Sequence, residues 1–216
     1  MGGVLGDEPA GVESILEFFR QHSKKYEKHF EFTAFPCVNP WGFEHFKREN
    51  GFGLNINREF KTESPSEEVC LILRHLKKRY AVAVDFHEDM KVWTRIGTNE
   101  PDGECPEKFF FWETCTNKMD RIGRRIIDNV TAAGYPVCGS PMIYGDRNNG
   151  GVIWYPDDAI SPCYSVCDSS DTFLIREGYT DHAFTVETPR DQDMSDRVTM
   201  NLITLRAILE EKLRTP

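Results

Sequence analysis

The run Tyr-Ala-Val-Ala-Val-Asp-Phe, at residues 80–86, constrains the fold more than any other feature of this sequence. It is almost entirely apolar, so it lacks the alternation of a strand that faces solvent on one side. Such a run is typical of a strand buried on both faces, in a parallel sheet that helices cover. Because the run ends at His87, Glu88 and Asp89, it also places polar side chains at one edge of that sheet.

Segments of helical and strand periodicity alternate along the rest of the chain. The spacing of apolar residues predicts helices over about 10–26, 64–79, 117–133 and 194–213. Strands are predicted at 30–38, 80–86, 109–112, 152–154 and 182–186, and residues 39–60 are predicted to form a long, ordered loop. The alternation predicts an α/β fold with a mixed, mainly parallel sheet and helices on both faces.

Several polar residues fall where strands are predicted to end. In open α/β sheets the chemistry lies beyond the carboxyl ends of the strands, and Glu8, His87 and Glu187 all fall at such ends. The loop adds Arg48 and the pair Asn57-Arg58, whose flat guanidinium and amide donors suit a carboxylate. Taken alone, the loop favours the simpler interpretation that its arginines form surface ion pairs with neighbouring glutamates.

Composition narrows the class of protein. The 216 residues predict one domain, and the net charge of -9 argues against nucleic acid or an anionic membrane as a partner. No apolar run approaches bilayer length and no signal peptide is visible. The seven cysteines contain no CxxC pair, which fits reduced thiols in the cytoplasm. Nothing in the sequence indicates an oligomeric state.

Four segments resemble motifs of the zinc metallocarboxypeptidases, in the same order along the chain. Gly-Gly-Val-Leu-Gly-Asp-Glu-Pro resembles their zinc-ligand turn, Gly-x-His-Gly-x-Glu-Pro. Asn-Pro-Trp-Gly, then Arg48, then Gly-Leu-Asn-Ile-Asn-Arg-Glu-Phe resembles Asn-Pro-Asp-Gly, an arginine, and Gly-Val-Asp-Leu-Asn-Arg-Asn-Phe. Val-Asp-Phe-His-Glu-Asp and Phe-Thr-Val-Glu-Thr-Pro resemble the strands of the last zinc histidine and the catalytic glutamate. The resemblance is to carboxypeptidase A-like enzymes, and is closest to their short bacterial branch.

The resemblance implies a function and a role for each matching residue. The function is zinc-dependent hydrolysis that releases a C-terminal residue from a peptide or peptide-like amide with a free carboxylate. By resemblance, the zinc ligands are Glu8 and His87, the general base is Glu187, the group that polarises the scissile carbonyl is Arg48, and the terminal carboxylate is held by Asn57 and Arg58.

The sequence departs from the family pattern in three places. Leu5 stands where the family has its first zinc histidine, so weak zinc binding and low activity are expected. The family has further strands before the zinc turn, so residues 1–216 are expected to be a single domain truncated at its N-terminus. For the family's mobile tyrosine, spacing suggests Tyr164 or Tyr179, although the best-matching position is Leu174.

Other functions remain open. The related N-acyl amino acid amidases, such as desuccinylases and aspartoacylase, share the zinc turn and an Asn-Arg pair. Leu5 motivates a third hypothesis, a non-catalytic descendant that binds carboxylate-ended ligands. Without the motifs, His87 could also be a hydrogen-bonded core histidine, Glu8 a charge at a helix N-terminus and Glu187 a carboxylate at the protein surface.

Overall fold

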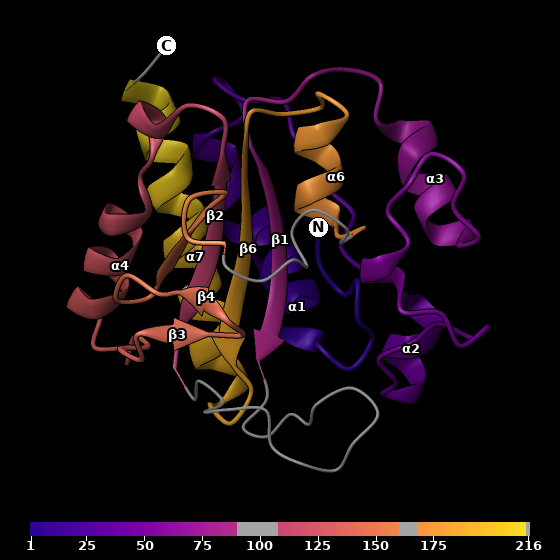
Figure 1. Ribbon diagram of the computed structural model, residues 1–216, viewed down its shortest axis with the longest axis horizontal. Coiled ribbons are helices and arrows are strands. Elements are labelled where there is room, and N and C mark those ends of the chain that lie inside the picture. Colours follow the sequence, from indigo (N-terminus) through magenta and orange to yellow (C-terminus); the bar gives the residue numbers. More distant parts are fainter. Residues whose placement is uncertain (90–107, 160–167, 215–216) are drawn as a thin grey trace.

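The computed structural model describes residues 1–89, 108–159 and 168–214 (Figure 1). Its main sheet has the strand order β1-β6-β2-β5. The pairs β1–β6 and β2–β5 are parallel and the pair β6–β2 is antiparallel, which confirms the predicted mixed, mainly parallel sheet. The four strands are β1 (Ala83–Asp89), β2 (Phe110–Cys115), β5 (Val152–Tyr155) and β6 (His182–Pro189).

The pairing of β1 with β6 brings two candidate site residues together. His87 on β1 is the direct register partner of Glu187 on β6. Because the two strands are parallel, both carboxyl ends lie at the same edge of the sheet, at the bottom of Figure 1. Side chains at paired positions point to the same face of a sheet, so the imidazole and the carboxyl group share one face.

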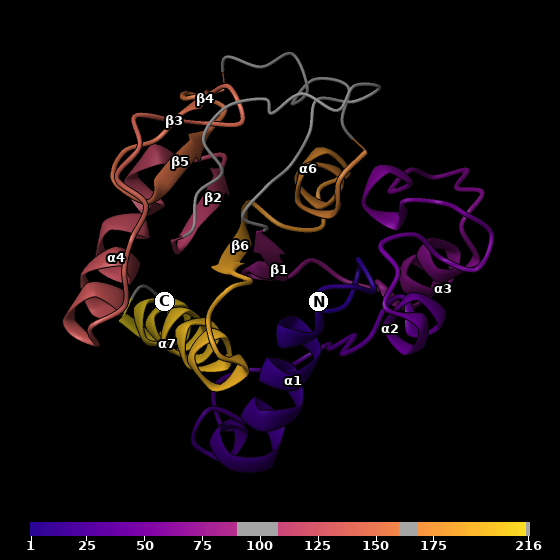
Figure 2. The ribbon, with the colours of Figure 1, turned by 90° about the horizontal axis from the view of Figure 1, so that it is seen from below.

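Helices cover both faces of this sheet, as predicted (Figure 2). On one face the long helix α7 (Met194–Arg214) packs beside α1 (Pro9–Glu17) and α4 (Gly123–Ala132). The opposite face carries α6 (Ser170–Arg176). The main core lies under α7, where Phe86, Phe111 and Phe184 of the strands pack with Met200 and Ile208 of the helix.

Capping residues determine where two further helices begin. The Asn39 side chain accepts a hydrogen bond from the Gly42 amide at 2.8 Å and starts α2 (Pro40–His45), with Pro40 in the first turn. The Ser66 hydroxyl accepts from the Val69 amide at 3.3 Å and starts α3 (Glu67–His75). The helix α2 interrupts the predicted loop of residues 39–60, which is otherwise irregular apart from a 3₁₀ turn at Ile56–Arg58.

Some local predictions were wrong. Residues 30–38 form no strand, because their backbone bonds go to the Gly2-Gly3 turn, as in Gly2 N to Phe35 O at 3.0 Å, and not to a neighbouring strand. The helix predicted to reach residue 26 changes to a π turn at Phe18–His22 and a 3₁₀ turn at Ser23–Lys25. Helices predicted to end at 79 and to begin at 117 end at His75 and begin at Gly123. The sequence analysis missed α6 and the short hairpin of β3 (Met142–Ile143) and β4 (Asp146–Arg147).

No helix in the described part of the chain has the length and the apolar character that a membrane span needs.

Candidate functional site

A glycine contact fixes the turn that carries Glu8. A Cβ atom on Gly6 would lie 2.1 Å from the backbone carbon of Gly42 and 2.5 Å from the Lys47 carbonyl oxygen. No side chain fits there, so the turn and the start of α2 touch backbone to backbone. This contact places the loop that carries Arg48 directly against the turn that carries Glu8.

Two carboxylates flank the imidazole of His87. Its Nδ1 atom lies 2.7 Å from Oε2 of Glu8, and its Nε2 atom lies 3.2 Å from Oδ2 of Asp85. All three side chains are buried. The amide of Glu88 also donates to Oε2 of Glu8 at 3.2 Å, and the Ser170 hydroxyl of α6 donates to Oδ2 of Asp85.

This arrangement shifts the pKa values of its members. Burial opposes the charged imidazole, but Asp85 and Glu8 outweigh it and raise the pKa of His87 well above its ordinary value. Burial also opposes the charged Asp85 carboxyl, yet the attraction of His87 outweighs it and lowers the pKa of Asp85. The centre of the site is therefore a charged imidazolium held between two carboxylates.

The loop contributes two groups to this centre. The Nη1 atom of Arg48 lies 3.3 Å from Oε1 of Glu8, and its side chain keeps 39% of its surface exposed. The Nδ2 atom of Asn57 lies 3.4 Å from Nε2 of His87, while its Oδ1 accepts the Ser170 amide at 3.2 Å. Asn57 thus joins the 3₁₀ turn to both β1 and α6.

Arg58 takes no part in the buried cluster. Its side chain is exposed and donates to the carbonyl of its neighbour Asn57 at 2.7 Å. It forms no ion pair with any residue in the described ranges 1–89, 108–159 and 168–214. The guanidinium therefore keeps donors available to solvent or to a ligand beside Asn57.

Glu187 lies beside His87 on the adjacent strand and is partly exposed. Burial of its carboxyl group raises its pKa well above the ordinary value. The positive charges of His87 and Arg48 act against this shift, and the carboxylates of Glu8 and Asp89 reinforce it. A carboxyl group that holds its proton to a higher pH than an ordinary glutamate therefore lies beside the imidazolium.

The residues present do not fit a zinc site with three protein ligands. The position of the first ligand in the resemblance is the aliphatic Leu5, whose side chain is 2% exposed. Glu8 and His87 contact each other at 2.7 Å, as a hydrogen-bonded pair, whereas two ligands of one tetrahedral zinc ion lie about 3.4 Å apart. Among the described residues, no group of three or more histidine, cysteine, aspartate or glutamate side chains is arranged to hold a metal.

Comparison with solved structures identifies the fold. A candidate metallopeptidase from Shewanella amazonensis superposes with a TM-score of 0.75 at 20% identity, over 97% of this chain and 74% of that one. A metallo-carboxypeptidase from Burkholderia cenocepacia gives 0.59 at 16% identity, over 100% of this chain and 56% of that one. Csd4 from Helicobacter pylori, a D,L-carboxypeptidase solved in an mDAP-bound form, gives 0.60 at 13% identity, over 100% and 50%.

This chain has the metallocarboxypeptidase fold. No protein-family model matches the sequence, and no curated protein does. The structural likeness therefore establishes the fold alone, and the function depends on the residues of the site.

On this metallocarboxypeptidase fold, the structure brings five of the six predicted site residues into one contact network. Glu8, His87, Glu187, Arg48 and Asn57 each contact or electrostatically influence another member, and only the side chain of Arg58 lies outside. The tyrosine candidates do not join them. Leu174 is a buried residue of α6 and packs in the apolar core. Tyr179 stacks on Phe173 of the same helix, and Tyr164 lies outside the described residues.

Sequence reasoning left four contributors without a role in the site. Asp85 precedes His87 by two residues, so the alternation of β1 was a signal that both share a face. Ser170 and Tyr144 had no such signal, because α6 and the β3–β4 hairpin were not predicted. The Tyr144 hydroxyl bonds to Asp89 at the end of β1, and the Nη1 atom of Arg190 bonds to Oδ2 of Asp7 at 3.1 Å beside Glu8.

Proposed function

We propose that this chain binds the free carboxylate end of a peptide or peptide-like amide, on a carboxypeptidase fold whose zinc site is incomplete. One observation carries the proposal. Glu8 and His87 form a hydrogen-bonded pair at 2.7 Å, while Arg48 beside Glu8 and Arg58 beside Asn57 keep exposed donors. The site therefore has capacity for an added anion and lacks the third ligand that a catalytic zinc ion needs.

The loop is suited to a carboxylate in particular. Arg58 presents an exposed guanidinium without an ion-pair partner in the described ranges, and a guanidinium can hold both oxygens of a carboxylate through parallel hydrogen bonds. Asn57 beside it is anchored by Ser170, which fixes the direction of the turn. Hydrogen bonds between charged groups of this kind contribute about 1.5–3 kcal/mol.

The comparisons support the same class of ligand. The Csd4 structure was solved with mDAP bound and is described as a D,L-carboxypeptidase. For the present chain, which shares only the fold, this favours a carboxylate-ended ligand.

Hydrolysis of the terminal amide is a second candidate function, and Glu187 favours it. A carboxyl group with a raised pKa beside a charged imidazole is what an acid–base catalyst requires. Leu5 argues against turnover, because zinc in such a site would have only Glu8 and His87 as protein ligands. The amidase alternative shares this objection and differs only in the acyl group of its substrate.

Calorimetric titration separates these functions. The probes are acetyl-Ala-Ala, the same dipeptide with an amidated C-terminus, and N-acetylaspartate, each with and without added zinc. We expect the free carboxylate to bind about 10-fold more tightly than the amide, without release of alanine or acetate. Arg58→Gln should abolish that difference, and Arg74→Gln, which changes an exposed arginine on α3, should keep it.

Three results would change the conclusion. Equal affinity for the free acid and the amide would refute carboxylate recognition. Release of alanine from acetyl-Ala-Ala by the zinc-treated chain would establish the peptidase, and release of acetate from N-acetylaspartate would establish the amidase.

A further inference from the structure

Two aromatic residues near the site have an unusual backbone. Phe46 has φ of 55° and Tyr144 has φ of 51°, and they are the non-glycine residues with positive φ in the described ranges. Bulky side chains rarely adopt this left-handed conformation because the Cβ atom is crowded by the backbone. Strained residues of this kind cluster at ligand sites, where the side chain must point in a fixed direction.

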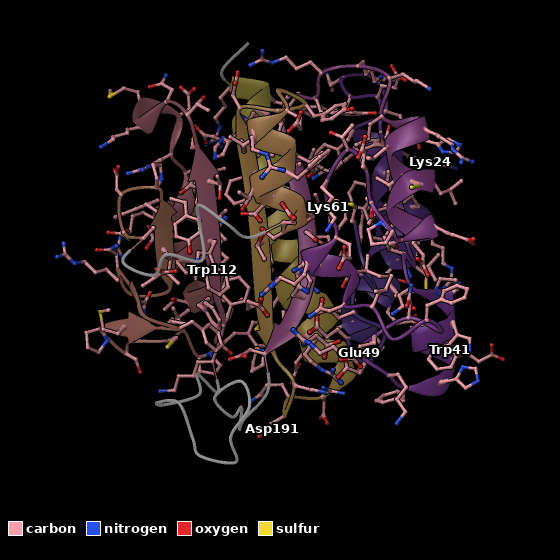
Figure 3. The ribbon with its side chains drawn as sticks, turned by 45° about the vertical axis from the view of Figure 1, so that its right-hand side comes forward. Lys24, Trp41, Glu49, Lys61, Trp112 and Asp191 are labelled. Carbon is pink, nitrogen blue, oxygen red and sulfur yellow. The ribbon has the colours of Figure 1, made fainter. Side chains whose placement is uncertain are left out.

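Burial of the Phe46 side chain contributes little energy to offset this backbone strain. It follows the last residue of α2, at a position where glycine is the usual choice. Its side chain is 63% exposed, and the same segment exposes Trp41 at 42% and Phe52 at 77%. Figure 3 shows Trp41 on α2, at the end of the molecule where β1 finishes. We call Trp41, Phe46 and Phe52 the aromatic rim.

Arg190 connects this rim to the candidate site. Its guanidinium carbon lies 6.0 Å from the centre of the Phe46 ring, and its Nη1 atom lies 3.1 Å from Oδ2 of Asp7, next to Glu8. Its backbone amide donates to the Asp89 carbonyl at 2.9 Å, at the end of β1. Phe46 therefore lies at the carboxyl edge of the sheet, on the Asp7 side of the turn.

The polar contacts give the site a direction. Asn57 contacts Nε2 of His87, Glu8 contacts Nδ1 of the same ring, and Arg48 contacts Glu8, so the contacts run in sequence from Asn57 to Arg48. A ligand whose carboxylate binds Asn57 and Arg58 would extend past Glu8 toward Arg48, and Phe46 precedes Arg48 by two residues. The ligand residue that precedes the carboxylate-bearing one then lies beside the aromatic rim.

From these relations we infer that the aromatic rim, through Phe46, selects a large apolar or aromatic side chain on the penultimate residue of the ligand. This inference rests on the proposed binding of a carboxylate end and names the side chain that such a ligand carries. A fixed, exposed ring next to a guanidinium offers both an apolar surface and a stacking partner. A second copy of this chain is the other occupant that three exposed aromatic side chains could attract.

The test compares acetyl-Phe-Ala with acetyl-Gly-Ala, which share the same C-terminal residue. Calorimetric titration of the full chain should give about 10-fold tighter binding of acetyl-Phe-Ala. Phe46→Gly should make the two affinities equal. Because glycine accepts the left-handed backbone, this variant should fold with a higher melting temperature. The matched control is Met119→Gly, which removes an apolar side chain that is 88% exposed on the 3₁₀ turn Lys118–Asp120, and which should retain the preference.

The outcomes separate this inference from the proposed function. Equal binding of both dipeptides by the unmodified chain, or a preference that survives Phe46→Gly, would overturn the role of the rim and leave carboxylate binding intact. Failure to bind either dipeptide would overturn both. A dimer in sedimentation equilibrium that Phe46→Gly dissociates would assign the rim to a second copy and not to the ligand.

Discussion

The Nδ1 atom of His87 lies 2.7 Å from Oε2 of Glu8, although 79 residues separate them in the chain. Asp85 contacts the other nitrogen at 3.2 Å, so the imidazole is enclosed by carboxylates in the core. A buried imidazolium is tolerated only with such partners. The residues that resemble zinc ligands thus form an internal ion pair in this chain.

His87 should remain protonated well above the pH at which an ordinary histidine loses its proton. Its pKa is raised well above the ordinary histidine value because Asp85 and Glu8 outweigh the effect of burial. In an NMR titration we expect the transition of the His87 ring signals to lie at a higher pH than the ordinary histidine value of about 6.5. Glu8→Gln should shift the His87 transition toward lower pH.

The same pKa shift predicts how stability depends on pH. The folded state binds the His87 proton more tightly than the unfolded state, so this contribution is complete below about pH 6.5 and is lost as the pH rises through the folded pKa. The raised pKa of Glu187 acts in the same direction. Urea denaturation should therefore show a lower free energy of unfolding at pH 9 than at pH 6.5. A constant value would contradict the charged assignment of His87.

Leu5→His should create a zinc site. It would place an imidazole beside Glu8 and His87 and complete three protein ligands. The metal-free variant should lose about 1–3 kcal/mol of stability, because a polar ring replaces a buried aliphatic side chain. Elemental analysis should find one equivalent of zinc in this variant.

The matched control for that substitution is Leu5→Met, which keeps an apolar side chain and should gain no zinc. If the unmodified chain holds one equivalent as firmly as Leu5→His does, Leu5 does not limit metal binding and the argument for an incomplete site fails.

Gly6→Ala should destabilise the fold and disturb the site together. The added methyl group would lie 2.1 Å from the Gly42 backbone carbon, and neither backbone segment can move without shifting the turn or α2. We expect a loss of about 1–3 kcal/mol in urea denaturation and weaker binding of acetyl-Ala-Ala. Gly139→Ala, where nothing lies within 4 Å of the added carbon, is the control and should change neither measurement.

Phe46→Gly should stabilise the protein by about 1 kcal/mol, because it relieves a left-handed phenylalanine. Phe52→Gly, which removes another exposed ring of the same segment without a positive φ, should bring no such gain. Equal melting temperatures for Phe46→Gly and the unmodified chain would show that the surrounding backbone holds Phe46 without strain.

The sequence was sufficient for features that depend on local pattern. The apolar run before His87 predicted a strand, and β1 extends through His87 to Asp89 as part of a mixed, mainly parallel sheet. The predicted bounds and burial were wrong, since β1 begins at Ala83 and its buried part is residues 85–89, not the apolar start of the run. The segment before Glu187 likewise predicted β6. The motifs indicated which residues share one end of the sheet, because the carboxyl ends of parallel strands meet at the same edge.

The local sequence pattern predicted the wrong conformation for segments whose conformation depends on a contact with a distant part of the chain. Residues 30–38 alternate like a strand, yet the Gly2-Gly3 turn takes their hydrogen bonds. The turn chemistry of Asn39 and Pro40 suggested a loop, although the same residues cap α2. These cases have one cause, since a segment with two acceptable local conformations adopts the one that its tertiary neighbours stabilise.

By itself, the sequence determined the fold class and the end of the sheet where the polar residues gather. It also determined that position 5 carries a leucine, where the family has a histidine. Only the tertiary structure decided that Glu8 and His87 bond to each other, that Asp85 and Ser170 complete their surroundings, and that Arg58 stays outside the cluster. The physical reason is that periodicity acts over a few neighbouring residues, whereas ion pairing and burial depend on which distant segments the folded chain brings within hydrogen-bonding distance.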